Sequence, residues 1–274
     1  MFRSVYQLLA ARAAQLDFLI ALGTHPALNE AGITQRLGAS VEELRTKYPR
    51  ARIFNHAWND PQQLRLLGTI STEEVAEISS GMMHEPVPVT INRMIFDYDL
   101  LMIIGPTFPH EVVGFSGGNK YLFPGIAGGE IIGMFHWLGA LITSPVIIGT
   151  KHTPVRKVVD RAAALVPVER MCLSLVVKGK ELAGLYIGAP EEAWNAAADL
   201  SEKIHLIYKD RPFKKVLSCA PPMYNDLWVG GKCTYKLEPV VAEGGELIIY
   251  APHIKEVSVS HGKEIQRIGY LVRD

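Results

Sequence analysis

Short runs of apolar residues alternate with segments of helical spacing along most of the chain. An apolar run bounded by glycine, proline or polar residues is typical of a buried strand. Such runs lie at residues 18–22, 100–104, 146–148, 216–219 and 247–250. Apolar residues that recur every three or four positions predict helices at residues 130–142, 155–165, 191–208 and 227–241. The alternation predicts an α/β fold with parallel or mixed sheets flanked by helices.

Some segments carry more specific signals. Ser40 followed three residues later by Glu43 predicts a capping box at the start of a helix. Residues 173–177 and 182–187, joined by a glycine-containing turn, predict a β-hairpin, and Glu243-Gly244-Gly245 predicts another turn.

The pattern breaks at residues 209–212, Lys-Asp-Arg-Pro. We therefore expect a first domain at residues 1–208 and a partial α/β domain at 209–274, with a cleft between them that holds the functional site. The chain starts one short helix before its first strand and ends within a helical pattern at residues 267–274. We expect it to be cut at both ends from a longer protein.

Composition and charge narrow the functional class. The 274 residues are 48% hydrophobic and 20% charged, as in ordinary globular proteins, and 28 basic residues balance 28 acidic ones. This balance gives no reason to expect nucleic acid or an anionic membrane as a partner. Three scattered cysteines without a CxxC pair favour a reducing compartment over a disulfide framework, so we expect a cytoplasmic protein.

Two apolar stretches could be mistaken for membrane segments. Arg12, Gln15 and Asp17 interrupt the first, at the N-terminus, so it does not resemble a signal peptide. The second, at residues 131–150, carries no formal charge and has the length of a bilayer span. Glycines, a histidine and a proline divide it, which predicts a helix followed by a strand instead.

The segment Phe108–Gly129 carries the chemistry. It contains six glycines in 22 residues and runs from the end of a predicted strand into a predicted helix, where ligands bind in α/β sheets. Exposed amides and a helix N-terminus could hold a phosphate there. A P-loop is excluded because Asn119 precedes Lys120 and Tyr121 follows it, and no G-x-G-x-x-G motif opens a helix.

A lysine and three histidines are the candidate functional residues: His25, His110, Lys120 and His136. His25 and His110 lie in predicted loops after strands, where either a turn histidine or an acid/base group would fit. Lys120 could equally be a solvated or a phosphate-binding lysine. His136 lies in the middle of a mostly apolar helix, and such a histidine is more often a hydrogen-bonded core residue than a metal ligand.

Taken together, these residues resemble the lactate racemase family. The matching motifs are Leu22-Gly-Thr-His-Pro26, Pro109-His110, Gly114-Phe-Ser-Gly-Gly-Asn-Lys120, Pro124-Gly-Ile-Ala-Gly128 and His136. Ten positions separate His110 from Lys120 and sixteen separate Lys120 from His136, as in the family pattern. Members of this family racemise 2-hydroxy acids with a nickel-pincer nucleotide, a pyridinium-3-thioamide-5-thiocarboxylate mononucleotide.

The resemblance implies a role for each residue. Lys120 is expected to carry the cofactor through a thioamide, and His136 to bind its nickel. His25 and His110 are expected to be the two acid/base groups, one at each face of a small 2-hydroxy acid. The neighbouring Ser116, Gly117 and Gly118 are expected to contact the cofactor. The implied partners are the proteins that synthesise the cofactor and insert nickel.

The expected chemistry is hydride transfer. The carboxylate of a 2-hydroxy acid destabilises a carbanion at Cα, whereas loss of hydride gives a planar keto acid that can be reduced on either face. Two opposed bases with pKa values near neutrality suit this reaction, and histidine supplies them. The cofactor would carry the hydride, and the protein would orient it.

The second domain matches the family more weakly. Trp228 and Lys232 resemble an aromatic residue and a lysine at the cofactor and substrate, but Val229 replaces an expected glutamine. An Asp-x-Thr-Arg-Pro-like segment of the family is absent. Two alternatives to a lactate-like racemase therefore stay open. One is a hydride-transfer isomerase for a larger hydroxy acid, and the other is a non-catalytic module that binds the cofactor.

Overall fold

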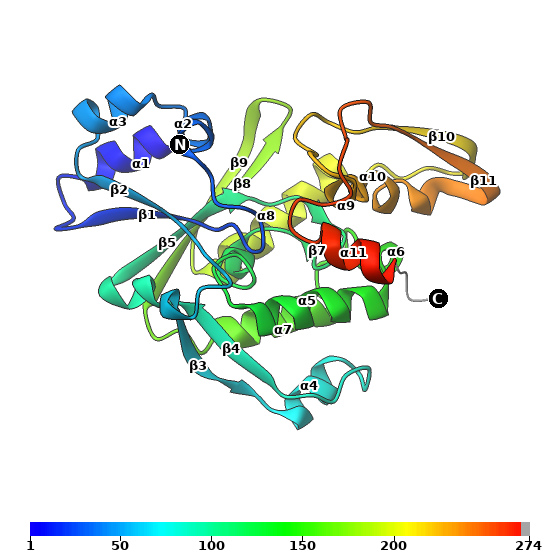
Figure 1. The fold of residues 1–274 in the computed structure, drawn as a ribbon, viewed down its shortest axis with the longest axis horizontal. Helices are drawn as coiled ribbons and strands as arrows, with labels where there is room; N and C mark the ends of the chain where they lie inside the picture. Colours follow the sequence, from blue (N-terminus) through cyan, green and yellow to red (C-terminus); the bar gives the residue numbers. More distant parts are fainter. Residues whose placement is uncertain (270–274) are drawn as a thin grey trace.

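The structure, a computed structural model, describes residues 1–269 (Figure 1). Its N-terminal part comprises α1 (Phe2–Leu9), β1 (Leu16–Ile20), α2 (Glu30–Leu37), α3 (Val41–Lys47) and β2 (Ala51–Asn55). β1 and β2 form a two-stranded parallel sheet, and Phe2, Tyr6 and Tyr48 pack together beside it. The capping box of Ser40 and Glu43 at the start of α3 is confirmed.

Two antiparallel strands, β3 (Leu64–Ile70) and β4 (Val87–Asn92), follow. The helix α4 (Thr72–Ile78) connects them, and two short 3-10 helices, η1 (Pro61–Gln63) and η2 (Arg93–Asp97), flank the pair. Ile70, Val89 and Ile91 are buried in the main core. This pair of strands therefore forms one wall of that core.

The central sheet has the strand order β5 (Leu100–Pro106), β8 (Glu169–Lys178) and β9 (Glu181–Gly188). β5 and β8 are parallel, while β8 and β9 form the predicted antiparallel hairpin. The helix α8 (Pro190–His205) packs against both hairpin strands. The predicted mixed α/β architecture is thus confirmed.

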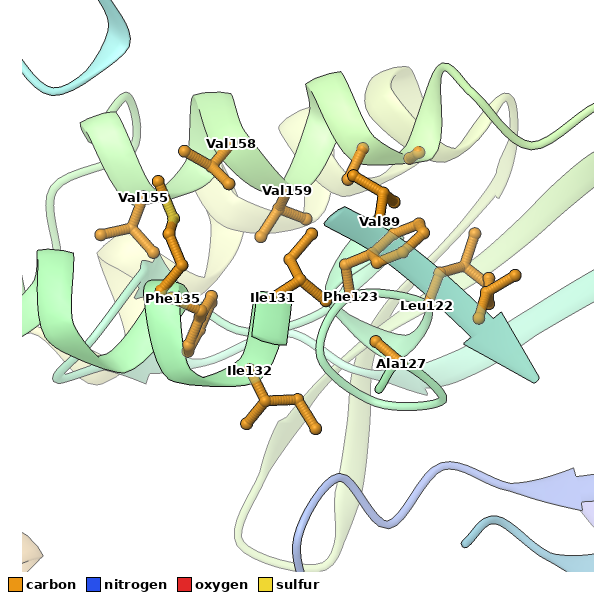
Figure 2. Close-up of a cluster of buried hydrophobic side chains, with 14 of the residues drawn as sticks. Val89, Leu122, Phe123, Ala127, Ile131, Ile132, Phe135, Val155, Val158 and Val159 are labelled. Carbon is orange, nitrogen blue, oxygen red and sulfur yellow. The ribbon is translucent and has the colours of Figure 1, made fainter. Parts of the chain in front are cut away.

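The main core lies around α5 (Gly129–Ile142) and α7 (Pro154–Ala163), which run side by side. Figure 2 shows Ile131 and Phe135 of α5 facing the valines Val155 and Val159 of α7. These four side chains are at most 2% exposed. Because α5 directly follows the glycine-rich segment, this packing fixes the end of the segment.

The predicted strand at residues 146–148 is wrong. The structure has a short helix, α6 (Ser144–Ile147), with Pro145 in its first turn, where proline favours a helix start. Val146 is exposed while Ile147 is fully buried, so the apolar run is not buried as a strand. Among residues 1–269, every helix is too short or too polar to span a bilayer.

Residues 213–269, called the C-terminal segment here, follow an irregular linker at residues 206–212. The strands β10 (Phe213–Cys219) and β11 (Val241–Tyr250) pair in parallel at one end of the molecule (Figure 1). The predicted turn at residues 243–245 is wrong, because these residues belong to β11 and lie where the pairing register shifts.

The predicted helix at residues 227–241 is also wrong. It is divided into α9 (Leu227–Gly230), α10 (Lys232–Tyr235) and η4 (Glu238–Val240). α9 ends at Gly230 and Gly231 separates it from α10, and glycine is a weak helix former. The last helix, α11, covers Gly262–Ile268, so most of the helix expected at residues 267–274 lies outside the described residues.

Candidate active site

The glycine-rich segment forms a tight loop after β5. The short strands β6 (Pro109–His110) and β7 (Gly114–Phe115) pair with each other, and the 3-10 helix η3 (Gly118–Tyr121) carries Lys120. The Ser116 hydroxyl accepts a hydrogen bond from Phe108 N (3.0 Å) and donates one to Pro106 O (3.1 Å). Ser116 thus braces the loop, and its expected contact with a cofactor stays a prediction.

Packing requires glycine at residues 117 and 118. Both have positive φ angles, +88° and +58°. A Cβ on Gly117 would lie 2.2 Å from Thr107 Oγ1, and one on Gly118 would lie 2.8 Å from Trp194 Cβ. The loop can therefore pack this closely against Thr107, which directly follows β5, and against α8 only without side chains at these two positions.

A buried cation supports the loop from behind. The Arg156 guanidinium donates hydrogen bonds to Phe115 O (2.5 Å) and Gly117 O (3.3 Å), and its Cζ lies 4.0 Å from the Trp194 ring centroid. Trp194 Nε1 in turn donates to Ser116 O (2.8 Å). Burial lowers the pKa of Arg156 to about 10, so it is still protonated at neutral pH. The carbonyl groups of three consecutive loop residues, 115–117, are thus hydrogen-bonded by Arg156 and Trp194.

Lys120 is a partly neutral amine at neutral to mildly basic pH. Burial and the nearby positive charge of Lys232 lower its pKa to about 8, against the opposing effect of Glu111. Its Nζ lies 5.6 Å from the centroid of the Phe135 ring. A lysine in such surroundings is a better nucleophile than a solvated one.

His136 has one ring nitrogen bound and the other available. Its Nδ1 lies 2.8 Å from Ile132 O, and a carbonyl can only accept, so Nδ1 carries the proton. The Nε2 lone pair is therefore free, and burial lowers the pKa of the ring to about 4, which keeps it neutral. A neutral histidine whose second nitrogen is hydrogen-bonded to a carbonyl has the form that metal-binding histidines take.

His110 is buried, and its tautomer is fixed by the backbone. Val112 N donates a hydrogen bond to Nδ1 (3.1 Å), so the proton of the neutral ring is on Nε2. Burial, followed by the positive charge of Lys120, holds the pKa of His110 well below its usual value. The ring is therefore neutral at neutral pH.

Glu111 belongs to the same cluster, although sequence analysis did not identify it. Its Oε1 lies 2.9 Å from Lys232 Nζ, and its side chain is 8% exposed. Burial alone would raise its pKa, but the charge of His110 once that ring is protonated in acid, the charge of Lys232 and the Lys232 hydrogen bond lower it to about 2. Because His110 is neutral at neutral pH, Lys232 is the counter-charge there. An acidic residue directly after His110, in an otherwise apolar run, was the available signal.

His25 lies in the exposed loop that meets the C-terminal segment. Ser260 Oγ donates a hydrogen bond to O of the adjacent Thr24 (3.3 Å). Partial desolvation of the ring by neighbouring groups lowers the pKa of His25, and the positive charges of Lys232 and Lys120 lower it further.

Trp228 lies on α9 with its ring 4.7 Å from that of His261, and His261 also affects the pKa of His136. His261 was not a candidate from the sequence.

A hollow lined by residues 209–212 and 239–243 contains none of the predicted site residues. Within residues 1–269, no three His, Cys, Asp or Glu side chains are grouped as a metal site.

The fold and these residues define an α/β protein whose ionisable groups converge from both sides of the linker. Residues 1–146 match the lactate racemase N-terminal domain, and this range contains His25, His110, Lys120 and His136. The chain belongs to the lactate racemase family.

Three relatives illustrate the similarity. A protein of known crystal structure from Thermotoga maritima is 34% identical with a TM-score of 0.90, over 99% of this chain and 68% of that one. The lactate racemase apoprotein from Thermoanaerobacterium thermosaccharolyticum has the same fold, with a TM-score of 0.73 and 20% identity over 92% of this chain and 58% of that one. The lactate racemase of Lactiplantibacillus plantarum is 23% identical over 87% of this chain, which spans only 52% of that enzyme.

Proposed function

We propose that this protein is an isomerase that racemises or epimerises a small, lactate-like 2-hydroxy acid with a lysine-tethered nickel-pincer nucleotide. The observation that carries the proposal is the gathering of Lys120, His110 and His136 with Lys232, whose Nζ lies 2.9 Å from the Glu111 carboxylate next to His110. The charge of Lys120 lowers the pKa of both histidines, and the charge of Lys232 lowers the pKa of Lys120 and of His110. Family membership supports the same reaction class.

The residues present fit the proposed cofactor. Lys120 would carry it through a thioamide, and His136 Nε2, with its lone pair free, would bind nickel. A metal that takes one ligand from the protein needs the others from the cofactor itself, which suits a pincer ligand. When bound, the cofactor would supply an acceptor for the hydride from the substrate Cα. Trp228 and the braced loop of Ser116, Gly117 and Gly118 would flank it.

The chain's own side chains would handle the substrate and the proton. Lys232 would bind the substrate carboxylate. His25, neutral at neutral pH, would take the hydroxyl proton at one face of the substrate. His110 would serve the other face, but it can accept a proton at Nε2 only after Nδ1 gives up the amide of Val112 and takes the ring proton. The two histidines are therefore not equivalent in the resting protein.

The attachment point can be tested by intact mass. Wild type and Lys120→Ala are each coexpressed with the proteins that make the cofactor. We expect the adduct on wild type alone, because no other amine lies in the glycine-rich segment. An adduct of the same mass on Lys120→Ala would overturn the assignment.

The metal ligand is tested in the same way with His136→Ala. We expect the organic adduct to remain and the nickel content to fall, because the variant lacks the protein ligand. Full nickel occupancy in the variant would exclude His136 as that ligand.

The acid/base assignment is tested by turnover. His25→Ala and His110→Ala should each lower racemisation by a factor of about a hundred or more, as expected for a positioned acid/base group. Deuterium at the substrate Cα should be retained during racemisation. Its rapid exchange with water would contradict the proposal, since it would indicate a carbanion.

Val229 favours a second candidate substrate class. An apolar side chain next to Trp228, where relatives of the family carry glutamine, removes a polar contact and suits a larger or more apolar hydroxy acid. A panel of 2-hydroxy acids of increasing size separates the two substrate classes. A fully loaded protein that turns over none of them would be a cofactor-binding module.

A further inference from the structure

We infer that Glu111 is a positioning residue that holds Lys232, and with it the C-terminal segment, against the loop of His110. The inference rests on the proposed function and deepens it, because it explains how the proposed substrate-binding lysine of the C-terminal segment comes to lie beside the loop of His110. The contact itself is between residues of the protein and does not depend on the cofactor.

In the ion pair of Glu111 and Lys232, Glu111 is the more buried and the more firmly held partner. The carboxylate side chain is 8% exposed and the Lys232 side chain 31% exposed, with 2.9 Å between Oε1 and Nζ. Ser144 Oγ donates a hydrogen bond to Glu111 O (3.0 Å), which fixes the backbone from which the carboxylate projects. Glu111 is thus a fixed point, and Lys232 is the partner that has to be held.

Lys232 needs such a contact because its own segment is weakly attached. It is the first residue of the four-residue helix α10, directly after Gly231. Among residues 1–269, the clusters of buried apolar side chains include no residue beyond Leu206, and the buried Tyr224 and Cys233 of this segment belong to none of them. Of the ion pairs formed by these residues, Glu111–Lys232 is the one that links the C-terminal segment to the rest.

A bound substrate would join this pair rather than replace it. An ammonium group has three N–H donors, and Glu111 takes one of them. Displacing Glu111 would leave a buried carboxylate without a counter-charge, which is strongly unfavourable. Lys232 can therefore stay bound to Glu111 while its remaining donors face a substrate carboxylate.

The contact is tested first in the apoprotein. Spin labels are attached to exposed Cys219 of β10 and to Glu202→Cys on the exposed side of α8, while Cys172 and Cys233 are buried. We expect a narrow distance distribution for this labelled background and a broader one after Glu111→Gln. The control, Glu246→Gln, breaks the exposed pair with Lys215 inside the β10–β11 sheet and should leave the distribution narrow.

The charge-reversed double variant, Glu111→Lys with Lys232→Glu, separates loss of the pair from misfolding. It restores an ion pair in the opposite sense, and we expect the narrow distribution to return. If Glu111→Gln leaves the distribution as narrow as the control does, the positioning role is wrong. A double variant that stays as broad as the single variant also contradicts it.

The second readout uses the cofactor-loaded protein. Glu111→Gln should raise KM for the hydroxy acid by about tenfold, a larger factor than any fall in kcat, because a misplaced Lys232 weakens substrate binding. A fall in kcat alone would assign Glu111 to the reaction itself and overturn the inference. If the loaded wild type turns over no hydroxy acid, the proposed function fails, while the distance measurement still decides the role of Glu111.

Discussion

The glycine-rich loop and the C-terminal segment both contribute to one cluster of ionisable residues, but they are held in place by different means. The loop is packed against α8 through Gly118 and Trp194, and Arg156 binds its carbonyl groups from behind. The C-terminal segment lies across a linker, and two polar contacts join it to the loops: Lys232 with Glu111 and Ser260 with Thr24.

This difference matters for the proposed chemistry. A cofactor-bearing lysine and a metal ligand need a rigid frame, because their geometry has to persist through every turnover. A substrate-binding lysine on a less firmly held segment can move when substrate enters or leaves. We therefore expect substitutions of the residues that support the loop to lower the stability of the whole fold. Substitutions in the C-terminal segment should affect that segment alone.

The largest effect is expected for Arg156→Met. The methionine removes the donors to Phe115 O and Gly117 O and leaves the loop carbonyls unpaired. The loss of a buried, hydrogen-bonded cation should lower the free energy of unfolding by about 3–5 kcal/mol. Urea denaturation followed by circular dichroism measures it, and a loss below about 1 kcal/mol would mean that packing alone holds the loop.

Opposite signs are expected for the two lysines. Lys120→Met removes a buried charge whose pKa is lowered from 10.5 to about 8, so it should stabilise the protein at pH 7 by about 2–3 kcal/mol. Lys232→Met leaves Glu111 unpaired and should destabilise by about 2 kcal/mol, less than for a fully buried pair because Lys232 is partly solvated.

The pH dependence provides the check for Lys120. With its pKa depressed in the folded state, the wild type binds fewer protons folded than unfolded between pH 8 and 10.5. The free energy of unfolding of the wild type should therefore rise through this window relative to that of Lys120→Met. The difference between the two proteins at pH 7 should then disappear at higher pH. A gap that stays constant up to pH 10.5 would show that the charge of Lys120 is not the cause.

The smallest effect is expected within the C-terminal segment. Asp226 accepts hydrogen bonds from Val229 N (2.8 Å) and Val259 N (2.9 Å), and Asp226→Ala should cost about 1–2 kcal/mol. Faster hydrogen exchange should be confined to residues 213–269. The matched control is Asp60→Ala, which removes a more exposed cap at η1 and should cost less than about 1 kcal/mol. Faster exchange across α5 and α7 would contradict a local role for Asp226.

Much of the α/β order could be predicted because it depends on local pattern. The run Leu100–Ile104, the helix after Gly129 and the hairpin around Gly179 each have one strong periodicity and clear breaks. The errors arose where two local signals conflicted. Pro145 starts a helix inside an apolar run that resembled a strand, and Gly230-Gly231 interrupts a spacing that resembled one long helix.

The site shows the same limit. Lys120, His110 and His136 could be singled out because they lie within one motif, and the hydrogen-bond partner of His136, Ile132 O, is a helical neighbour. Glu111 and His261 depend on partners far along the chain, and sequence spacing carries no information about such pairs. The packing role of Gly118 likewise depends on Trp194, which belongs to a later helix.

The hydrogen bond from the Val112 amide to His110 has a kinetic consequence for the racemisation that we propose. Two enantiomers of a hydroxy acid have equal free energy, so kcat/KM must be the same in both directions, whatever the protein does. A difference between the two histidines can then change kcat and KM for one enantiomer relative to the other only if both change by the same factor. The enantiomer whose hydroxyl meets His110 should have the lower kcat and, by the same factor, the lower KM. The enzyme should therefore saturate at a lower concentration of that enantiomer than of its mirror image.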